Sequence, residues 1–468
     1  MEAGIKERVF AEIAAISAAC VVAAIPAPDG LEQKAMWVLA LMVWAIINWI
    51  TKAMEDYIVI LLMCCVWVVL GIVPFQIAFG SFSSTTIWLL IAAMGIGCAV
   101  TKSGLLQRAA LMAMRLCPAD FRGQSSALLL SGICVGPLIP STTAKVTIMG
   151  SVATGIGEML GYGKQSKGMA GLWCAMYTGY TLLAPVCLNA SFHGYIIYHL
   201  MPADVQKKMT FGYWMLGMLP WGILCGLMGL FLIMVLYRPS GDKACDRQKV
   251  ETMYLNLGPM VKDEKVTLAI LLGCVCLWIM EQKLGIPAAV TAILGLCFLS
   301  VSGILTRQDF ENRIPWGLIV FMGGAINLAS VITEVKIDQW IGRVLGPVFT
   351  LLAGRIYLFL PVVAIAVLVT RFLIVDMATC YSLFILVLLP VCREYGISPW
   401  LVGMASYVVV MPWFAKYQNT NFLAAFQSAG GENVVRHRDL IPYCIGFHVA
   451  AIVCLCLCIP YWRWLGLA

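Results

Sequence analysis

The 468-residue sequence is poor in charge, since Asp, Glu, Lys and Arg make up only 12% of it. Soluble proteins of ordinary composition carry about 25% charged residues. Apolar side chains account for 61% of this chain, and its mean hydropathy is +0.90. This composition excludes an ordinary soluble domain. Because a helix satisfies its own backbone hydrogen bonds in lipid, the composition predicts an all-α polytopic membrane protein.

Metal-binding and catalytic patterns are also missing. The four histidines have no cysteine or carboxylate neighbours at ligand spacing, and the nineteen cysteines form no CxxC pair. Most cysteines lie inside apolar runs, which is typical of reduced, packed thiols. The sequence contains no HExxH, paired-acid or nucleophile motif. We therefore expect no metal, no cofactor and no enzymatic activity. A membrane-embedded enzyme and a channel are the weaker alternatives.

Acidic residues are fewer than basic ones, 24 against 31. Nucleic-acid binding is not needed to explain this excess, because cytoplasmic loops of membrane proteins collect Lys and Arg. With the N-terminus in the cytoplasm, 19 basic residues fall on the cytoplasmic side, 9 on the opposite side, and Lys145, Arg371 and Lys416 within the membrane. The sequence thus predicts a multi-pass protein of the cell membrane with a cytoplasmic N-terminus and no nucleic-acid partner.

One polar stretch, GPLIPSTTAKVT at residues 136–147, interrupts a long apolar region. The apolar arms at 127–135 and 146–160 are shorter than the roughly 20 residues that cross a bilayer. Two short arms around a polar turn predict a re-entrant hairpin at about 123–161. Irregular backbone at that depth occurs only where it is buried in protein or lines a cavity. We therefore expect this turn to line a polar cavity.

The same order of segments occurs twice. The first hairpin is followed by a segment at 168–202 that Pro185 and several polar residues interrupt. In the second half, a hairpin candidate at about 354–393 precedes an interrupted segment at 399–428. Two halves with broken helices are typical of secondary transporters with internal repeats. The predicted orientation makes the two hairpins enter from opposite sides, so the repeats would be inverted.

These patterns predict three regions. The first repeat would occupy 1–237 and include the N-terminal helix, a cytoplasmic loop would occupy 238–265, and the second, inverted repeat would occupy 266–468. Together the repeats would hold about 11 spans and two hairpins. Residues 102–115 have the amphipathic pattern of a helix that lies along the membrane interface.

The layout of the whole chain resembles the divalent anion/sodium symporter family, whose fold has two inverted repeats with re-entrant hairpins. Family hairpins carry a Ser-Asn-Thr tip, and Ser141-Thr142-Thr143 differs from it by one residue. In the branch of citrate/succinate and oxoglutarate/malate antiporters, an arginine follows Ser-Asn-Thr-Ala, and Lys145 stands in that place. The resemblance implies a homodimer that moves small dianions across the bilayer by an elevator-like or rocking motion.

The second half departs further from the family pattern. Its tip is either Cys380-Tyr381-Ser382 or residues 376–379, and arms of similar length favour the second register. The Gly-Thr-Pro-Pro-Asn loops of sodium-coupled members are absent from both interrupted segments. Because these loops and tips form sodium sites in the family, the departures favour sodium-independent exchange. Coupling to Na⁺ or H⁺ is left open; if sodium is coupled, its expected ligands are Ser141, Thr143 and Asp376.

Three ionisable residues stand out in the apolar segments. A charge at the bilayer centre costs at least ~2.5–3.5 kcal/mol and marks a pathway or a paired site. Lys145 and Lys416 suit a dianionic substrate, and a fixed ammonium could replace a sodium ion; a stem that reaches to the interface is the alternative for both. Asp376 has three open roles: sodium ligand, proton carrier, or ion-pair partner of Lys416 or Arg371.

Hydroxyls, amides and helix starts bind carboxylates through donated hydrogen bonds and the positive end of the helix dipole. Helix capping is the compatible alternative for the hydroxyls of the first hairpin. The expected substrate-contacting residues are Ser141, Thr142, Thr143, Lys145, Thr181, Asn189, Asp376, Ala378, Thr379, Lys416, Gln418, Asn419 and Thr420. We predict a secondary transporter that exchanges small divalent organic anions such as C4-dicarboxylates. A Na⁺- or H⁺-coupled symporter of sulfate or a small sulfonate is the alternative.

Overall fold

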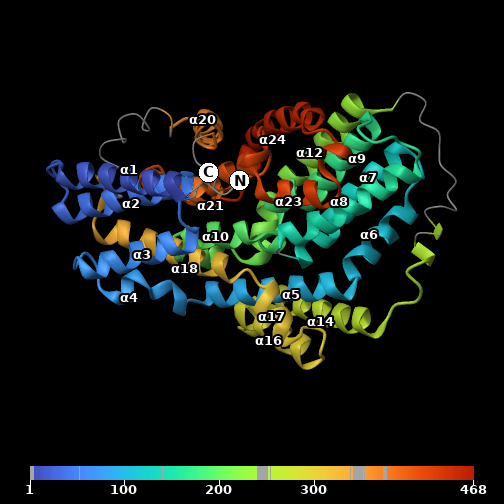
Figure 1. The fold of residues 1–468 in the computed structure, drawn as a ribbon, viewed down its shortest axis with the longest axis horizontal. Coiled ribbons are helices and arrows are strands. Elements are labelled where there is room, and N and C mark those ends of the chain that lie inside the picture. The colour runs from blue at the N-terminus through green and yellow to red at the C-terminus, as the bar shows by residue number, and fades with distance from the viewer. Residues whose placement is uncertain are drawn as a thin grey trace.

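The computed structural model describes residues 5–51, 53–139, 141–239, 251–252, 254–337, 339–340, 352, 354–372 and 377–468. Within these ranges the chain is helical and contains no strand, which confirms the all-α prediction (Figure 1). The first half contains α1 (Ile5–Ala24), α2 (Gln33–Thr51), α3 (Asp56–Val69), α4 (Phe75–Ala78), α5 (Thr85–Ser103), α6 (Leu105–Leu116), α7 (Phe121–Val135), α8 (Thr142–Met159), α9 (Lys167–Tyr177), α10 (Phe192–Leu200), α11 (Ala203–Lys208) and α12 (Phe211–Tyr237).

The second half contains α14 (Lys262–Ile279), α15 (Glu281–Leu284), α16 (Ala288–Val301), α17 (Arg307–Arg313), α18 (Trp316–Glu334), α20 (Ile356–Thr370), α21 (Met377–Glu394), α22 (Pro399–Val410), α23 (Thr420–Ser428) and α24 (His437–Trp464). The helices α7 and α8 lie in the segment expected to form the first hairpin, and α20 and α21 lie in the second. We call these the first and second helix pairs.

Helices of the two halves are interleaved in space. In one group, α3 packs against α18 and α5 packs against α16, with α1, α2 and α14 beside them. In the other, α12 packs against α24 and α8 packs against α23, while α22 contacts both α20 and α21. Figure 1 shows these pairs lying side by side. We call the first group the frame helices and the second group, which holds both helix pairs, the site helices.

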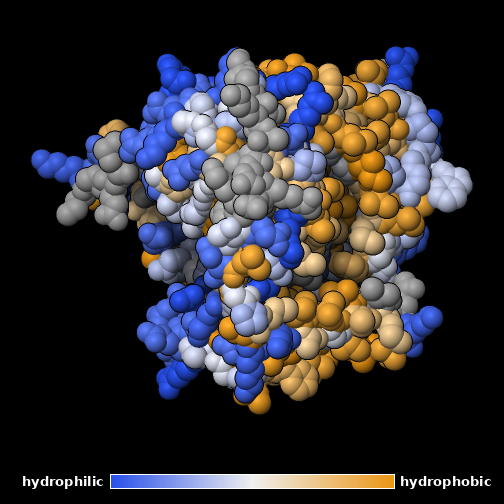
Figure 2. Space-filling model, turned by 90° about the vertical axis from the view of Figure 1, so that its right-hand side faces the viewer, coloured by the Kyte–Doolittle hydropathy of each residue, from blue (hydrophilic) through white to orange (hydrophobic). Residues whose placement is uncertain are grey.

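Several described helices have the length and composition to cross a membrane. These are α12, α18 and α24, and α5 together with α6 forms a fourth candidate that is bent by 64°. Shorter apolar helices include parts of α2 and α3 and the whole of α16, α20 and α22. Figure 2 shows an apolar band running from top to bottom of one face, with hydrophilic side chains to its left and others at its right edge. The predicted number of spans stays a prediction.

The bend between α5 and α6 occurs at Gly104, whose φ of +83° is left-handed. Glycine adopts this conformation without the Cβ clash that other residues meet, so it ends one helix and starts the next in a new direction. Beyond the bend, α6 buries one apolar face that includes Leu106 and Met114. Arg108 on the same helix is buried in an ion pair with Glu264 at 2.7 Å. The amphipathic segment expected at 102–115 is therefore helical and packed against the chain that leads into α14.

One close backbone approach joins α7 to the turn η3 (Thr178–Leu182) after α9. A Cβ added to Gly132 would lie 2.3 Å from the carbonyl carbon of Gly179, and one added to Gly179 would lie 2.4 Å from the Leu129 oxygen. Backbone atoms cannot move aside as a flexible side chain can. These two glycines therefore fix the distance between the first helix pair and the interrupted segment beside it.

We expect the Gly132→Ala substitution to destabilise the protein. Overpacking typically costs about 1–3 kcal/mol, and a methyl group against backbone falls at the upper end of that range. The measurement is the melting temperature and the monodisperse yield of purified protein in detergent. Gly212→Ala is the matched control, because a Cβ at Gly212 meets nothing within 4 Å. Equal melting temperatures for the two variants would contradict the close contact.

Candidate functional site

The turn of the first helix pair contacts both interrupted segments. Ser141 caps α8, its Oγ accepting a hydrogen bond from the Ala144 amide at 3.4 Å. Thr142 donates to Ser191 Oγ at 3.0 Å, on the segment that follows α9. Thr143 donates to Asn421 Oδ1 at 2.5 Å, on α23. The three hydroxyls expected at one site are thus gathered at a junction of three elements. The sequence favours Thr143 as the N-cap of this helix, but Ser141 caps it and Thr143 bonds to Asn421 instead.

Lys145 lies one helical turn beyond the cap and is fully buried. Its ammonium donates to the Ala190 carbonyl at 2.6 Å and to the Gly136 carbonyl at 3.3 Å. No carboxylate pairs with it among the ion pairs of the described residues. Gly136 belongs to the turn η2 (Gly136–Leu138) of the first helix pair, and Ala190 to η5 (Leu188–Ala190). The charge is therefore held by backbone oxygens of two different elements.

A second buried cation, Arg371, lies in the second half. The guanidinium of Arg371, 2% exposed and directly after α20, donates to the Gln418 carbonyl. In return, Gln418 Nε2 donates to the Arg371 carbonyl at 3.4 Å. The other end of the Gln418 amide accepts hydrogen bonds from the amides of Phe414 and Ala415 at 2.8 and 3.0 Å. Gln418, expected to contact substrate, instead joins the second helix pair to the second interrupted segment.

Lys416, expected within the membrane, is only partly buried. Its ammonium pairs with Glu432, and 41% of the side-chain surface is exposed. Lys416 also lies 5.3 Å from the centre of the Phe426 ring. Glu432 belongs to the segment predicted to be cytoplasmic, and the hydrogen bond from Lys416 lowers the pKa of its carboxyl group. This geometry matches the alternative interpretation, a stem that reaches to the interface, and Arg371 rather than Lys416 is the buried cation.

Asn419 and Thr420 begin α23. Asn419 caps the helix: its Oδ1 accepts hydrogen bonds from the Phe422 amide at 3.0 Å and the Tyr177 hydroxyl at 3.1 Å. Its Nδ2 donates to the Met411 carbonyl at 2.7 Å. The bond to Met411 lies within the second interrupted segment, whereas the bond from Tyr177 joins this segment to α9. Thr420, in contrast, is exposed.

The two candidates in the first interrupted segment are both buried. Thr181 lies in η3, and Asn189 lies in η5 next to the Lys145 ligand Ala190. Asn189 Oδ1 has no hydrogen-bond partner among the described residues. Asn189 also lines a cavity of about 220 Å³ with Gln206, Lys207 and Thr210. An unpaired amide beside a basic side chain makes this cavity a candidate route to the site.

The described part of α21 starts at Met377, and the residues just before it, 373–376, lie outside the described ranges. Cys380-Tyr381-Ser382 therefore lies inside a helix, which agrees with the register that places the turn nearer residue 376. Ala378 is buried in the first turn of α21. Asp376 lies outside the described residues, and the side chain of Thr379 is not described.

A polar cavity of about 570 Å³ separates frame from site helices on another side. Its wall includes Ser81, Asn327 and Glu334 from the frame, and His199 and Arg393 from the site helices. The Ser81 amide donates to Asn327 Oδ1 at 2.8 Å. The cavity is large enough for a small organic anion.

The sequence analysis did not include four residues of this junction among the expected site residues: Ser191, Asn421, Arg371 and Tyr177. Ser191 and Asn421 stand in polar runs that interrupt apolar segments, and this was the available signal. Arg371 was visible as a third intramembrane charge. Tyr177 gave no signal, because a tyrosine in an apolar helix is ordinary and only the fold brings its hydroxyl to Asn419.

The described chain is thus a helical membrane protein in which two interrupted segments and two helix pairs meet around buried cations. Residues 6–467 match the family described as the sodium:sulfate symporter transmembrane region, and the chain belongs to this family. The family and the relatives named below are transporters, so this protein is a membrane transporter and not an enzyme.

Curated relatives carry more particular names. The chain is 27% identical to the putative malate transporter YflS of Bacillus subtilis, over 68% of each chain. It is 24% identical to the L-tartrate/succinate antiporter of Escherichia coli O6:K15:H31, over 77% of each chain. It is also 24% identical to the chloroplastic dicarboxylate transporter 1 of Arabidopsis thaliana, over 71% of this chain and 61% of the relative.

Among solved structures, the chain is similar to the YdaH transporter of Alcanivorax borkumensis. The TM-score is 0.55 and the sequence identity is 14%, over 84% of this chain and 88% of the other. At this identity the likeness concerns the fold alone. It supports a transporter-like helical architecture for the chain.

Proposed function

We propose that the protein exchanges small divalent organic anions of the C4-dicarboxylate class across the cell membrane without requiring sodium. The observation that carries this proposal is the bonding of Lys145, whose ammonium is held by the carbonyls of Ala190 and Gly136. Unwound backbone carbonyls at broken helices are the ligands that bind coupling cations in secondary transporters. A covalently attached ammonium in such a position supplies a positive charge without an ion having to bind.

Arg371 supports the same interpretation from the second half. Its guanidinium is buried and hydrogen-bonded to the Gln418 carbonyl of the second interrupted segment. Each helix pair therefore carries one fixed cation bonded to the interrupted segment of its own half. Two fixed positive charges balance a dianion better than a cation or a neutral solute. If no coupling ion has to bind, the carrier returns to its starting conformation only with another anion bound. A carrier of this kind exchanges one anion for another.

The expected substrate contacts are Ser141, Thr142 and the start of α8. The first amides of α8 lie at the positive end of its dipole, which favours a carboxylate. The hydroxyl of Thr142 now bonds to Ser191 and would turn toward substrate when it binds. Substrate contact by Thr181, Asn189, Ala378, Thr379 and Asp376 is part of the same proposal.

The architecture that we propose has two inverted repeats, at 1–237 and 266–468, with the two helix pairs as re-entrant hairpins. The site helices would move against the frame helices by an elevator-like or rocking motion, within a homodimer whose N-termini are cytoplasmic. The grouping of helices in Figure 1 supports this division, since both helix pairs and both interrupted segments belong to one group.

A sodium- or proton-coupled symporter of sulfate or a small sulfonate is the second candidate. The family description favours it, because it names sodium and sulfate. In that case Ser141, Thr143 and Asp376 would be the expected sodium ligands. The bond from Thr143 to Asn421 Oδ1 places one of these oxygens next to an amide oxygen, a second ligand type that sodium accepts.

The test is uptake of labelled succinate into proteoliposomes, with or without unlabelled succinate inside, in sodium and in choline buffer. We expect internal succinate to raise the initial rate at least tenfold, equally in both buffers, because an exchanger turns over only when both sides supply anion. Empty liposomes are the control. Strict dependence on sodium would refute the fixed-cation proposal, and uptake of sulfate but not succinate would favour the second candidate.

A further inference from the structure

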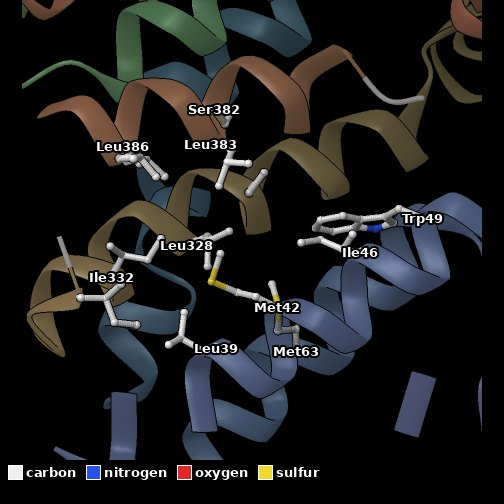
Figure 3. A pocket seen from close by; sticks show the side chains of 13 residues that line it. Leu39, Met42, Ile46, Trp49, Met63, Leu328, Ile332, Ser382, Leu383 and Leu386 are labelled. Carbon is white, nitrogen blue, oxygen red and sulfur yellow. The ribbon is translucent and has the colours of Figure 1, made fainter. Parts of the chain in front are cut away.

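An apolar cavity of about 140 Å³ lies between the frame helices and the second helix pair. Figure 3 shows its walls: α2 contributes Leu39, Met42 and Ile46, and α21 contributes Leu383 and Leu386 from the opposite side. Further side chains from α3 and α18 close it. The cavity lies apart from the hydroxyls and cations of the candidate site, and the proposed function gives it no role.

The lining defines the chemistry of an occupant. Among the described residues that line the cavity none is charged, and the polar groups are the hydroxyl of Ser382 and the indole of Trp49. Trp49 is 6% exposed, and its indole N–H has no hydrogen-bond partner among the described residues. Apolar cavities of about 150 Å³ stay dry and bind small hydrocarbons. Water is therefore a poor occupant, and a hydrocarbon with an oxygen acceptor for the indole is a good one.

The shape of the cavity points to a chain rather than a compact molecule. Leu39 and Trp49 both line it, and at a rise of 1.5 Å per residue they lie about 15 Å apart along α2. The helix α2 is apolar over Gln33–Trp49 and, in a membrane protein of this class, would lie among lipid tails. A cavity that extends along such a helix runs in the direction of the lipid tails around it.

The two helix pairs differ in their contact with the frame. On the first, a Cβ added to Gly97 of α5 would lie 3.3 Å from Ile139 and 3.7 Å from the Ser141 Cβ, so the frame touches the turn directly. On the second, the apolar cavity separates α21 from α2 and α18. Leu386 of α21 also lines the polar cavity of about 570 Å³. Movement of α21 toward the frame would shrink both cavities together.

We infer that this cavity is a binding site for the acyl chain of a membrane lipid, which occupies the space between α2 and α21 and slows exchange by holding the second helix pair away from the frame. A ligand that fits one conformation and not the other shifts the population toward the first. The effect on exchange rests on the proposed function, whereas the binding site does not.

The test uses the full-length protein in liposomes that contain phosphatidylcholine with a photoactivatable diazirine in one acyl chain. After irradiation, mass spectrometry locates the labelled residues. We expect labelling of cavity residues, Met42, Ile46 and Leu383, to exceed labelling of equally apolar residues on lipid-exposed faces such as Leu227 by at least fivefold. Uniform labelling of all apolar faces would overturn the inference.

Filling the cavity supplies the matched variants. Ala325→Leu places extra side-chain volume in the cavity, and Ala14→Leu makes the same change at an exposed position of α1. We expect Ala325→Leu to lower labelling of the cavity residues at least fivefold and Ala14→Leu to leave it unchanged. Ser382→Leu is the second filling variant if Ala325→Leu does not fold. Unchanged labelling in a folded filling variant would contradict the site.

Two further readouts separate the remaining outcomes. The first readout uses a water-soluble aliphatic diazirine. If this probe labels the cavity residues and the lipid probe does not, the occupant is a free solute and the lipid assignment is wrong. Exchange should rise at least twofold when long-chain lipids are replaced by lipids with short acyl chains, and this rise should vanish in Ala325→Leu. Because labelling needs no transport, a protein that binds the chain but exchanges no succinate would refute the proposed function and leave the site intact.

Discussion

Replacing Lys145 by methionine is expected to lower succinate exchange about 100-fold. An ammonium about 6 Å from one carboxylate, at an effective dielectric constant of about 20, contributes about 3 kcal/mol, which corresponds to roughly two powers of ten in affinity. Methionine has a similar length but cannot donate to the carbonyls of Ala190 and Gly136, which now hold the ammonium. The loss is measured as initial exchange rate in proteoliposomes against succinate concentration.

Adding sodium tests whether the Lys145 ammonium occupies the place of a sodium ion. With the ammonium gone, the two carbonyls form an incomplete ring of hard oxygen ligands, which Na⁺ can occupy. We expect 100 mM sodium to restore part of the exchange in Lys145→Met and to have no effect on the unmodified protein. Lys164→Met is the matched control, because Lys164 is exposed and should tolerate the change. Full activity of Lys145→Met in sodium-free buffer would refute the fixed-cation proposal.

Replacing Arg371 by methionine is expected to have the second largest effect, a reduction in exchange of about 50- to 100-fold. The guanidinium supplies the second buried charge and the donor to the Gln418 carbonyl. Its loss leaves that buried carbonyl without this donor, which costs about 1–3 kcal/mol in addition to the electrostatic term. The concentration dependence of exchange, together with the melting temperature, separates lost anion affinity from lost stability.

Arg355→Met is the control for this variant. Arg355 precedes the same helix, α20, but is exposed, so the substitution removes an equal charge from the surface. Gln418→Ala should lower the melting temperature while keeping most of the anion affinity, because the cation remains. If Arg371→Met changes stability but not the apparent affinity for succinate, Arg371 has a structural role and one fixed cation suffices.

The different environments of Lys416 and Arg371 could not be predicted from the pattern of apolar residues. Lys416 and Arg371 each stand in or beside an apolar segment, and hydropathy treats them alike. Their difference arises from partners: Lys416 meets Glu432, sixteen residues on, and Arg371 meets Gln418, 47 residues on. A charge that finds a carboxylate near the interface is stabilised there. The Arg371 guanidinium is buried and donates to the Gln418 carbonyl of another segment.

Other structural features could be predicted from the sequence because they depend on residues that are close together in the chain. The polar turn at 136–147 stood out between two apolar arms, and its hydroxyls do meet the interrupted segments. The amphipathic pattern at 102–115 became α6, since helical periodicity is a local property.

The sequence by itself determined the class of molecule. Low charge and long apolar segments leave a helical membrane protein as the stable solution, since lipid offers no partner for open backbone groups. The tertiary structure alone decided which cation is buried and which carbonyl oxygens bind it. It also decided where an apolar cavity lies between frame and site helices. Thr143 and Asn421 are 278 residues apart, and their contact depends on the packing of α8 against α23. Contacts at such separations follow from how whole helices fit together, which no local pattern of residues encodes.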